Sequence, residues 1–307
     1  MARELTAQEV YDDCMSGFGE DLRALILSPG WSDLMINSDG KVFIDRGDME
    51  ECRCRVNQKG LISAALTLAS YSHKNFNNDE DQSLVAILPI LNLRVVIWNQ
   101  PCSENVSAVF RRPFGRLITP EELIEGGTIT ETQLDAMRGY IMKHSNIIIS
   151  GGTGSGKTTL MNSFLTLIDP RERLFLIEDT PELQVQHENV QKLTVNAKYT
   201  YTQAIADSLR GRPTRIIVGE CRQGDQTMQM LKAWNTGHPG GLTTIHANSC
   251  DDVISRMEQL CGEVSVSSQR SMIESCVDVI LQMERDGRTS KRHVVDFLDL
   301  RKGVRIE

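Results

Sequence analysis

The stretch with the clearest capacity for chemistry is the glycine-rich run at residues 150–159. It follows the apolar, strand-like sequence NIIIS and contains Gly151, four further residues and then Gly156-Lys157-Thr158, after which apolar residues recur at helical spacing. Glycines let the backbone curl so that successive N–H groups point at phosphates, and the positive end of the following helix adds attraction. A glycine-rich turn with an accidental lysine is the alternative, which the flanking strand and helix disfavour.

The resulting P-loop assignment gives specific roles to these side chains. Lys157 is expected to reach the β- and γ-phosphates, and the Thr158 hydroxyl is expected to hold Mg²⁺. ATP and Mg²⁺ are therefore the expected cofactors. The loop residues expected to contact the nucleotide are Gly152, Thr153, Gly154, Ser155, Gly156, Lys157, Thr158 and Thr159.

Two other strand-like runs end in carboxylates that hydrolysis could use. RIIVGECR contains Glu220, and LFLIEDTPEL contains Glu178 and Asp179. The carboxyl ends of parallel strands face the ligand crevice, and hydrolysis needs a group that orients water. We expect Glu220 to position the water, and Glu178 to support Mg²⁺ or a second water. Either glutamate could instead cap a helix.

Two histidines flank a glycine pair in TGHPGGLTTIHAN. His238 and His246 do not have the i, i+4 spacing of a helical metal pair, and no C-x-x-C motif completes a zinc site. His246 follows the strand-like LTTI, where an imidazole could hydrogen-bond a γ-phosphate and change partner when that phosphate leaves. His238 is expected to shape the turn. A satisfied core histidine is the alternative for both.

Three arginines are clustered in LRGRPTR, at Arg210, Arg212 and Arg215. Cations at the end of a helix are favoured by the helix dipole, and these side chains could have only that role. Phosphoryl transfer, however, often uses an arginine from a neighbouring subunit. Both interpretations of Arg212 follow from its position.

The order of helical and strand-like runs along the chain indicates an α/β protein with two domains. Helical and strand-like runs near the amino terminus, among them KVFID, GLISAALTLASYS and LRVVIWN, predict a small α+β domain at 1–112. A proline- and glycine-rich linker with at most a short helix is expected at 113–130. In 131–307, strand-like and helical runs alternate, which predicts a largely parallel sheet covered on both faces and a closing hairpin near Asp286–Gly287.

Composition limits the possible partners and location. The chain has 33 Lys and Arg against 41 Asp and Glu, a net charge of −8, so stable sequence-specific binding of nucleic acid is not expected. The longest apolar region, Leu84–Trp98, is interrupted by polar residues and is too short for a membrane span. The polar, acidic amino terminus does not resemble a signal peptide. We expect a cytoplasmic protein whose eight cysteines are reduced.

Four segments in order make the chain recognisable. GGTGSGKTT, IEDTPEL, SLRGRPTRIIVGECR and LKAWNTGHPGGLTTIHAN resemble the P-loop, Asp box, Walker B segment and His box of the type II/type IV secretion ATPases, over residues 146–261. Within that superfamily the chain is most similar to the TrbB-type conjugal-transfer ATPases. The segment AVFRRP is also similar to a strand of the pilus retraction motors.

The resemblance implies an architecture and a set of partners. It implies a RecA-like motor domain, a smaller PAS-like amino-terminal domain, and a homo-hexameric ring with nucleotide between the two domains. Such a ring would lie in the cytoplasm, peripheral to the inner membrane. Its expected partners are the inner-membrane components of a secretion or conjugation channel and the coupling ATPase of that channel.

The resemblance also assigns roles to individual residues. It places the phosphate-sensing histidine of the family at His246 and its inter-subunit arginine at Arg212. It maps two arginines of the amino-terminal domain onto Arg94 and Arg111. Arg222, directly after the Walker B strand, is a further expected phosphate sensor.

The expected function is ATP hydrolysis coupled to transfer or assembly in a type IV secretion or conjugation system. A pilus or type II secretion motor is the first alternative, although assembly motors of that kind commonly carry paired C-x-x-C cysteines, which this chain lacks. A DNA-stimulated RecA-like translocase is the second alternative. The acidic charge and the lack of an obvious basic, aromatic-rich loop count against it.

Overall fold

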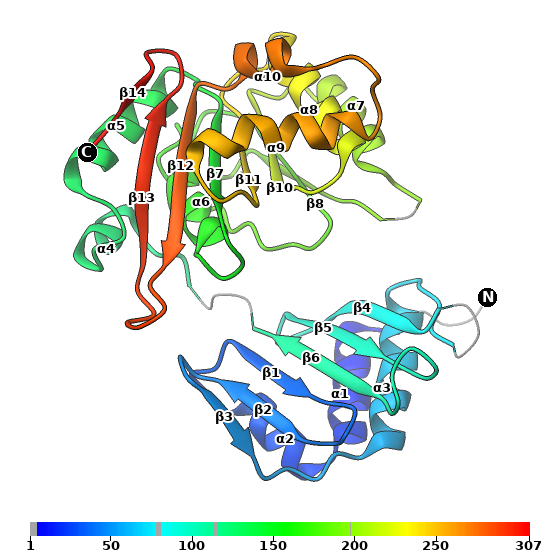
Figure 1. Ribbon diagram of the computed structural model, residues 1–307. Coiled ribbons are helices and arrows are strands. Elements are labelled where there is room, and N and C mark those ends of the chain that lie inside the picture. Colours follow the sequence, from blue (N-terminus) through cyan, green and yellow to red (C-terminus); the bar gives the residue numbers. More distant parts are fainter. Residues whose placement is uncertain (1–4, 78–80, 113–115, 197) are drawn as a thin grey trace. The chain divides into compact units, whose positions relative to one another are not determined.

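The computed structural model describes most of the chain, over residues 5–77, 81–112, 116–196 and 198–307. These residues form two compact units, unit 1 (Met1–Gly115) and unit 2 (Arg116–Glu307) (Figure 1). The first part of the expected linker, 113–115, lies outside the described residues. The remainder contains the short helix α4 (Pro120–Glu125), whose Leu123 belongs to a hydrophobic core of unit 2.

The described residues of unit 1 form an antiparallel sheet with helices packed on it. The strand order is β3-β2-β1-β6-β5-β4. In chain order the elements are α1 (Ala7–Phe18), α2 (Glu20–Leu27), β1 (Asp33–Ile36), β2 (Val42–Asp45), β3 (Met49–Cys52), α3 (Gln58–Tyr71), β4 (Ser83–Leu88), β5 (Leu93–Trp98) and β6 (Ser107–Arg111). This is the α+β class that the sequence predicts.

Alternation along the strands explains why unit 1 has helices on one face of its sheet. In β5, every second residue from Leu93 onward is buried, and the residues between them are only half-buried. Successive strand residues point to opposite faces, so this pattern buries one face. Phe18 of α1 meets Phe110 of β6 edge to face, with ring centroids 5.4 Å apart. The core of unit 1 therefore lies between its helices and the buried face of the sheet.

The described residues of unit 2 form a larger sheet with the strand order β14-β13-β12-β7-β11-β10-β8-β9. After α4, its elements in chain order are α5 (Glu131–Met142), β7 (Ile147–Gly151), α6 (Lys157–Leu165), β8 (Leu174–Glu178), β9 (Val190–Thr194), α7 (Tyr201–Arg210), β10 (Arg215–Cys221), α8 (Gly224–Asn235), β11 (Leu242–Ile245), α9 (Cys250–Gly262), α10 (Arg270–Cys276), β12 (Val279–Arg285), β13 (Arg292–Asp299) and β14 (Val304–Arg305).

The pairing in this sheet is largely parallel, as the sequence predicts. Strands β12, β7, β11, β10, β8 and β9 pair in parallel, whereas β13 and β14 are antiparallel additions at one edge. The hairpin expected near Asp286–Gly287 is the β12–β13 connection, where the Asp286 N–H donates to the Lys291 carbonyl. Carboxyl ends of parallel strands lie along one edge of a sheet, so the residues that follow β7, β8, β10 and β11 are brought together.

Helices cover both faces of the unit 2 sheet. Ile147 and Ile149 of β7 pack in a core with residues of α4, α5 and α6, whereas Ile148 between them packs with residues of α7, α8, α9 and α10. Burial on both faces explains why the strand sequences are apolar throughout instead of alternating. Among the described residues of the chain, no helix is long and apolar enough to cross a bilayer.

Threonines fix where several helices of unit 2 begin. Thr119, Thr130 and Thr200 each accept a hydrogen bond from the backbone N–H three residues later, and the side chain at that later position bonds back to the threonine N–H. These capping boxes satisfy backbone donors that a helix start otherwise leaves free. Helix α6 has no side-chain cap, which leaves its first N–H groups for another acceptor.

Candidate functional site

Glycine geometry gives the P-loop its shape. Gly151 ends β7 with φ of +151°, and a side-chain carbon there would lie 2.4 Å from the Met283 carbonyl oxygen. Gly156, directly before α6, has φ of +96°, which is the left-handed region that glycine adopts without strain. The loop therefore brings its backbone to the uncapped start of α6, where N–H groups and the helix dipole favour an anion.

Lys157 folds back over the loop. Its Nζ donates to the carbonyl oxygens of Gly151 and Gly152, each at 2.9 Å, and lies 3.4 Å from His246 Nδ1. Burial lowers the pKa of Lys157 to about 8, although the nearby Glu220 carboxylate favours the charged form. A bound triphosphate would oppose the effect of burial, because nearby negative charge raises the pKa of an ammonium.

The remaining P-loop side chains fit a nucleotide with Mg²⁺. Ser155 Oγ is buried and has no hydrogen-bond partner among the described residues, and a buried hydroxyl of this kind calls for a partner. Thr158 and Thr159 are half-buried in the first turn of α6, where a P-loop presents its Mg²⁺-binding hydroxyl. The exposed loop residues are Gly152, Thr153 and Gly154.

Glu220 lies at the carboxyl end of β10, beside His246. Its Oε1 is 2.8 Å from His246 Nε2, but no donor among the described residues is aligned to hydrogen-bond that oxygen. The side chain is 18% exposed. This oxygen is buried and lacks a hydrogen-bond donor in the described part of the chain, so it calls for a partner such as a water molecule, which a water-orienting group must hold.

His246 connects Lys157 with Glu220 in space. Burial and the nearby Lys157 charge lower the pKa of His246. A lowered pKa favours the neutral imidazole near pH 7, which carries one donor and one acceptor nitrogen. An imidazole in that state can donate to a phosphate oxygen or accept from the lysine, and its role as a phosphate sensor stays a prediction.

Arg222 is held between two carboxylates. It donates to Glu220 Oε2 at 2.6 Å and to Asp179 Oδ2 at 3.0 Å. Burial acts to lower the pKa of Arg222, but its hydrogen bond to Glu220 and the two negative charges outweigh this effect, so the pKa is raised. The structure thus places Arg222 beside the expected water-positioning carboxylate, and phosphate contact by Arg222 stays a prediction.

Glu178, at the end of the neighbouring strand β8, has a different environment. It is only 6% exposed, and its Oε1 accepts the backbone N–H groups of Glu182 and Leu183, each at 2.9 Å. Burial raises the pKa of Glu178 to about 7, although these two hydrogen bonds act to lower it. A side-chain carbon at Gly219 would lie 3.0 Å from Glu178 Cγ, so the glycine before Glu220 leaves room for this side chain.

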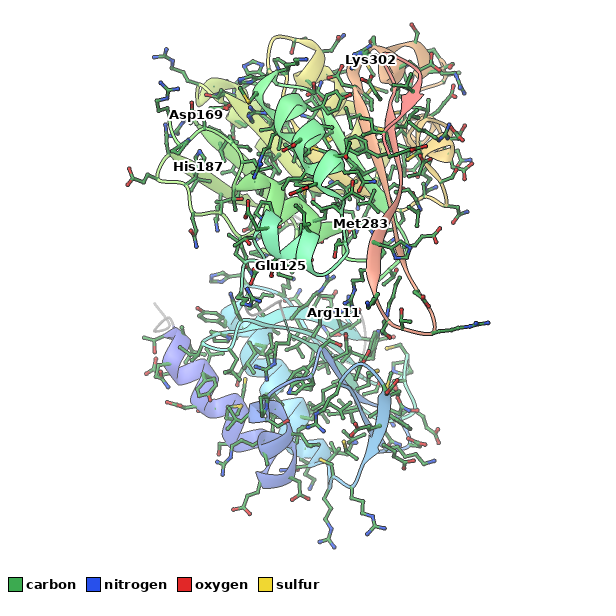
Figure 2. The ribbon with its side chains drawn as sticks, turned by 90° about the vertical axis from the view of Figure 1, so that its left-hand side faces the viewer. Arg111, Glu125, Asp169, His187, Met283 and Lys302 are labelled. Atoms are coloured by element: carbon green, nitrogen blue, oxygen red, sulfur yellow. The ribbon has the colours of Figure 1, made fainter. Side chains whose placement is uncertain are left out.

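The loop that Glu178 holds has further anchors. Asn162 of α6 donates to the Glu182 carbonyl at 3.1 Å and accepts the Gln184 N–H at 2.9 Å. His187 and Asp169, labelled in Figure 2, meet where His187 Nε2 lies 3.0 Å from the Asp169 carbonyl oxygen. In this structure Glu178 accepts hydrogen bonds from the backbone of the loop at residues 182–183. Its predicted contact with Mg²⁺ or a second water would be a further role.

Arg212 lies away from these residues within the chain. It follows Gly211 in the turn before β10, is exposed and has a φ of +54°. Glu220 is at the other end of β10, and the strand from Arg215 to Glu220 covers about 16 Å at the usual rise per residue. Arg215, in contrast, is buried and bonds to both oxygens of Glu172 at 2.7 and 2.8 Å. Arg215 is thus held inside its own chain, whereas the exposed Arg212 can reach another molecule.

The two histidines that flank the glycine pair lie at opposite ends of β11. His246 follows the carboxyl end, whereas His238 precedes the amino end. The turn between His238 and β11 is held by Asn146, whose Oδ1 accepts the N–H groups of Gly240 and Gly241 at 2.8 and 3.0 Å. His238 is thus part of the turn that begins β11, and it does not join the Lys157–His246–Glu220 group.

The two arginines assigned in unit 1 are neighbours. Arg94 of β5 lies directly opposite Arg111 of β6, and Arg111 lies opposite Asp33 of β1. The Arg111 Nε donates to Asp33 Oδ1 at 2.7 Å. Nucleotide contact by either arginine stays a prediction. The sequence interpretation missed Asp33 because its pairing depends on strand order.

Another residue that the sequence interpretation missed is Arg292, at the start of β13. Its Nε donates to the Gly154 carbonyl at 2.8 Å, and its Cδ would lie 3.0 Å from a side-chain carbon at Gly156. No local motif announces this contact, because 138 positions separate the two bonded residues. Arg292 therefore completes the surroundings of the P-loop from a distant strand.

Comparisons with known proteins agree with this arrangement. The model of the family described as "Type II/IV secretion system protein" matches residues 43–298. The conjugal transfer protein TrbB of Rhizobium radiobacter is 36% identical over 259 residues, which cover 83% of this chain and 80% of that protein. The type IV secretion system protein VirB11 of Bartonella henselae is 30% identical over 272 residues, which cover 73% of this chain and 76% of that protein.

Solved structures support the fold. The VirB11 ATPase from the Brucella suis type IV secretion system has a TM-score of 0.52 and 24% identity, over 97% of each chain. The pilus retraction motor PilT with bound ADP has a TM-score of 0.58 and 18% identity, over 87% of this chain and 78% of that one. The predicted α/β class, with a RecA-like P-loop motor domain and a smaller α+β domain, is confirmed.

Proposed function

Because the chain belongs to the type II/IV secretion system protein family, we propose that it hydrolyses ATP to drive transfer or assembly in a type IV secretion or conjugation system. The observation that carries this proposal is the convergence of three strand ends. His246, after β11, lies between the other two residues. Its Nδ1 is 3.4 Å from Nζ of Lys157, which follows β7, and its Nε2 is 2.8 Å from Oε1 of Glu220, at the end of β10. These are the side chains that nucleotide binding and hydrolysis require.

The residues have separable tasks in this proposal. The P-loop amides and Lys157 bind the triphosphate, and Thr158 holds Mg²⁺, which supplies positive charge to the phosphate oxygens. Glu220 accepts a hydrogen bond from the attacking water through Oε1 and orients it. His246, which lies between Lys157 and Glu220, contacts the γ-phosphate and changes partner when that phosphate leaves.

The proposed motor is a homo-hexameric ring that works in the cytoplasm at the inner membrane. Arg212 supports a shared site, because the length of β10 separates it from Glu220 of its own chain. An exposed arginine on a fixed turn can instead stabilise phosphate charge in a neighbouring subunit. Channel components of the inner membrane and the coupling ATPase of the channel are the proposed partners.

The test is the ATPase rate per subunit as a function of protein concentration, with the mass measured under the same conditions. If the active site is shared between subunits, the rate per subunit rises with the fraction of assembled rings. Lys157→Ala, which removes the phosphate-binding cation, serves as the inactive control. Full activity in a sample that contains only monomers would contradict the ring mechanism, and absence of activity in assembled rings would contradict the function.

A further inference from the structure

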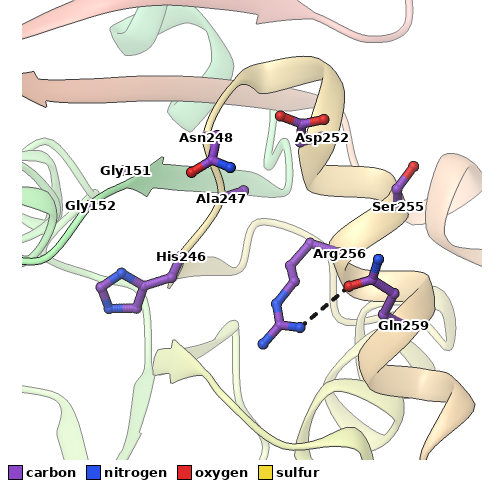
Figure 3. A pocket seen from close by; sticks show the side chains of 9 residues that line it. All are labelled: Gly151, Gly152, His246, Ala247, Asn248, Asp252, Ser255, Arg256 and Gln259. Atoms are coloured by element: carbon purple, nitrogen blue, oxygen red, sulfur yellow. Dashed lines mark hydrogen bonds between the residues drawn. The ribbon is translucent and has the colours of Figure 1, made fainter.

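A pocket adjoins the P-loop on the side of α9 (Figure 3). Its volume is about 340 Å³, and it is lined by residues 151–152, by residues 246–248 and by side chains of α9 that include Asp252 and Arg256. This volume is within the usual range for small-ligand pockets. Lys157 bonds to the carbonyls of the same two glycines, so the pocket begins where Lys157 would hold a terminal phosphate.

Arg256 supplies positive charge to this pocket. Figure 3 shows its side chain extending from α9 toward the side of the pocket where His246 lies. Its guanidinium donates to the neutral Gln259 Oε1 at 3.4 Å, and no carboxylate in the described part of the chain forms an ion pair with it. Arg222, by comparison, is bound to two carboxylates. Arg256 therefore keeps its capacity to bind an anion.

Asp252 limits how tightly an anion can bind. It lies one helical turn before Arg256 and also lines the pocket, and its Oδ2 accepts a hydrogen bond from Ser249 Oγ at 2.8 Å. A carboxylate within the same pocket repels an anion and weakens its binding. A weak anion site next to the reaction centre suits a product that must leave more than a substrate that must stay.

We propose that this pocket receives the inorganic phosphate produced by hydrolysis, and that Arg256 binds the phosphate before it departs. The inference rests on the proposed function. Hydrolysis breaks the bond between Pγ and the β–γ bridging oxygen and forms a bond between Pγ and the water oxygen. The proton of the water passes through Glu220 to the product phosphate. ADP keeps the P-loop contacts, and the free phosphate moves into the pocket past His246.

Direct binding of inorganic phosphate tests the pocket without turnover. Phosphorus-31 NMR of phosphate added to the full chain saturated with ADP gives the dissociation constant, with chloride holding the ionic strength constant. We expect Arg256→Gln to weaken phosphate binding on the order of tenfold, because a charge-assisted hydrogen bond is lost. Arg256→Lys keeps the charge and should retain most of the affinity.

Kinetic measurements show whether Arg256 contacts the product or the nucleotide. In Arg256→Gln, inhibition of the ATPase by inorganic phosphate should weaken by the same factor, whereas inhibition by ADP and the KM for ATP stay unchanged. Arg270→Gln is the matched control, because Arg270 is an exposed arginine of α10 that pairs with Glu274. This control should leave phosphate binding as in the wild type.

Two results would overturn the inference. The first is that Arg256→Gln binds phosphate with the same affinity as the wild type. The case in which neither protein binds phosphate saturably counts as this result. The other is a parallel loss of ATP, ADP and phosphate affinity, which would make Arg256 a nucleotide contact. A wild-type chain that binds phosphate through Arg256 but does not hydrolyse ATP would contradict the proposed function and leave the phosphate site intact.

Discussion

Glu220 and Glu178 occupy similar positions on neighbouring parallel strands but have different surroundings. Glu220 ends β10 next to Arg222 and His246, with one oxygen that no described donor is aligned to bond. Glu178 ends β8 in a buried position, where two backbone N–H groups bond to one of its oxygens. The end of a parallel strand therefore brings a carboxylate to the site. The local hydrogen-bond partners of that carboxylate determine whether it can orient a water molecule or accepts hydrogen bonds from a loop backbone.

Gly219 links the two environments. Because residue 219 has no side chain, Glu178 occupies the space beside β10 directly before Glu220. A larger residue at position 219 would displace the Glu178 side chain, since its Cβ would lie 3.0 Å from Glu178 Cγ. Glu178 thus packs against the residue that precedes Glu220, and Glu220 is the carboxylate that lies beside the histidine.

The largest expected effect is on the ATPase rate, which should fall much more when Glu220 is replaced than when Glu178 is replaced. Glu220→Gln should lower kcat by about 10²- to 10⁴-fold with little change in ATP affinity, because the amide cannot take the proton of water. Glu178→Gln should retain at least a tenth of wild-type kcat, because the amide oxygen can still accept the loop N–H groups. The measurement is steady-state ATPase activity together with equilibrium ATP binding. Equal losses in the two variants would remove the functional distinction between them.

A mixing experiment tests whether Arg212 of one subunit acts at the active site that contains Glu220 of another subunit. Neither Arg212→Ala nor Glu220→Gln should hydrolyse ATP well alone. After subunit exchange, about a quarter of the interfaces in randomly mixed rings would combine an intact Arg212 with an intact Glu220. Activity should therefore recover toward about a quarter of the wild-type rate. Labelled subunits confirm that exchange has taken place. If activity does not recover after confirmed exchange, Arg212 would have only the role of a cation at the end of its helix.

A third expected effect is on stability and concerns Glu178. Native Glu178 keeps its proton up to a pKa of about 7, whereas the unfolded chain releases it near 4.5. The native state thus binds more protons between these values, so the contribution of Glu178 to stability falls as pH rises through this window, by on the order of 3 kcal/mol. Glu178→Gln does not titrate and should lack this loss.

The readout is chemical denaturation of the wild type and of Glu178→Gln at pH 5 and pH 8. The free energy of unfolding of the wild type, relative to that of the variant, should be lower at pH 8 than at pH 5. Glu220→Gln is the control for a strand-end glutamate that is less deeply buried than Glu178. A stability difference between wild type and Glu178→Gln that does not change with pH would show that Glu178 is not desolvated in the native state.

Local sequence pattern was sufficient to predict much of the fold and to bring several residues into one candidate site. The P-loop, the strands around it and the β12–β13 hairpin were predictable because glycine spacing, apolar runs and turn residues act over a few neighbouring positions. The helix α1 was not among the predicted elements, although Thr6 and Glu9 form a capping box at its start. The helix is short, and polar residues separate its few apolar ones. Packing of its Phe18 against Phe110, which is distant in sequence, stabilises the helix.

Sequence alone could place Glu220, Glu178 and His246 at strand ends and Lys157 at the start of the helix after the P-loop, because parallel strands share the direction in which their ends face. It could not determine which carboxylate would be buried under a loop, since that depends on the backbone of residues 182–183 and on Asn162 of α6. Such contacts form only when the chain is folded, because burial and hydrogen-bond geometry depend on every element that packs around a side chain and not on its neighbours in sequence.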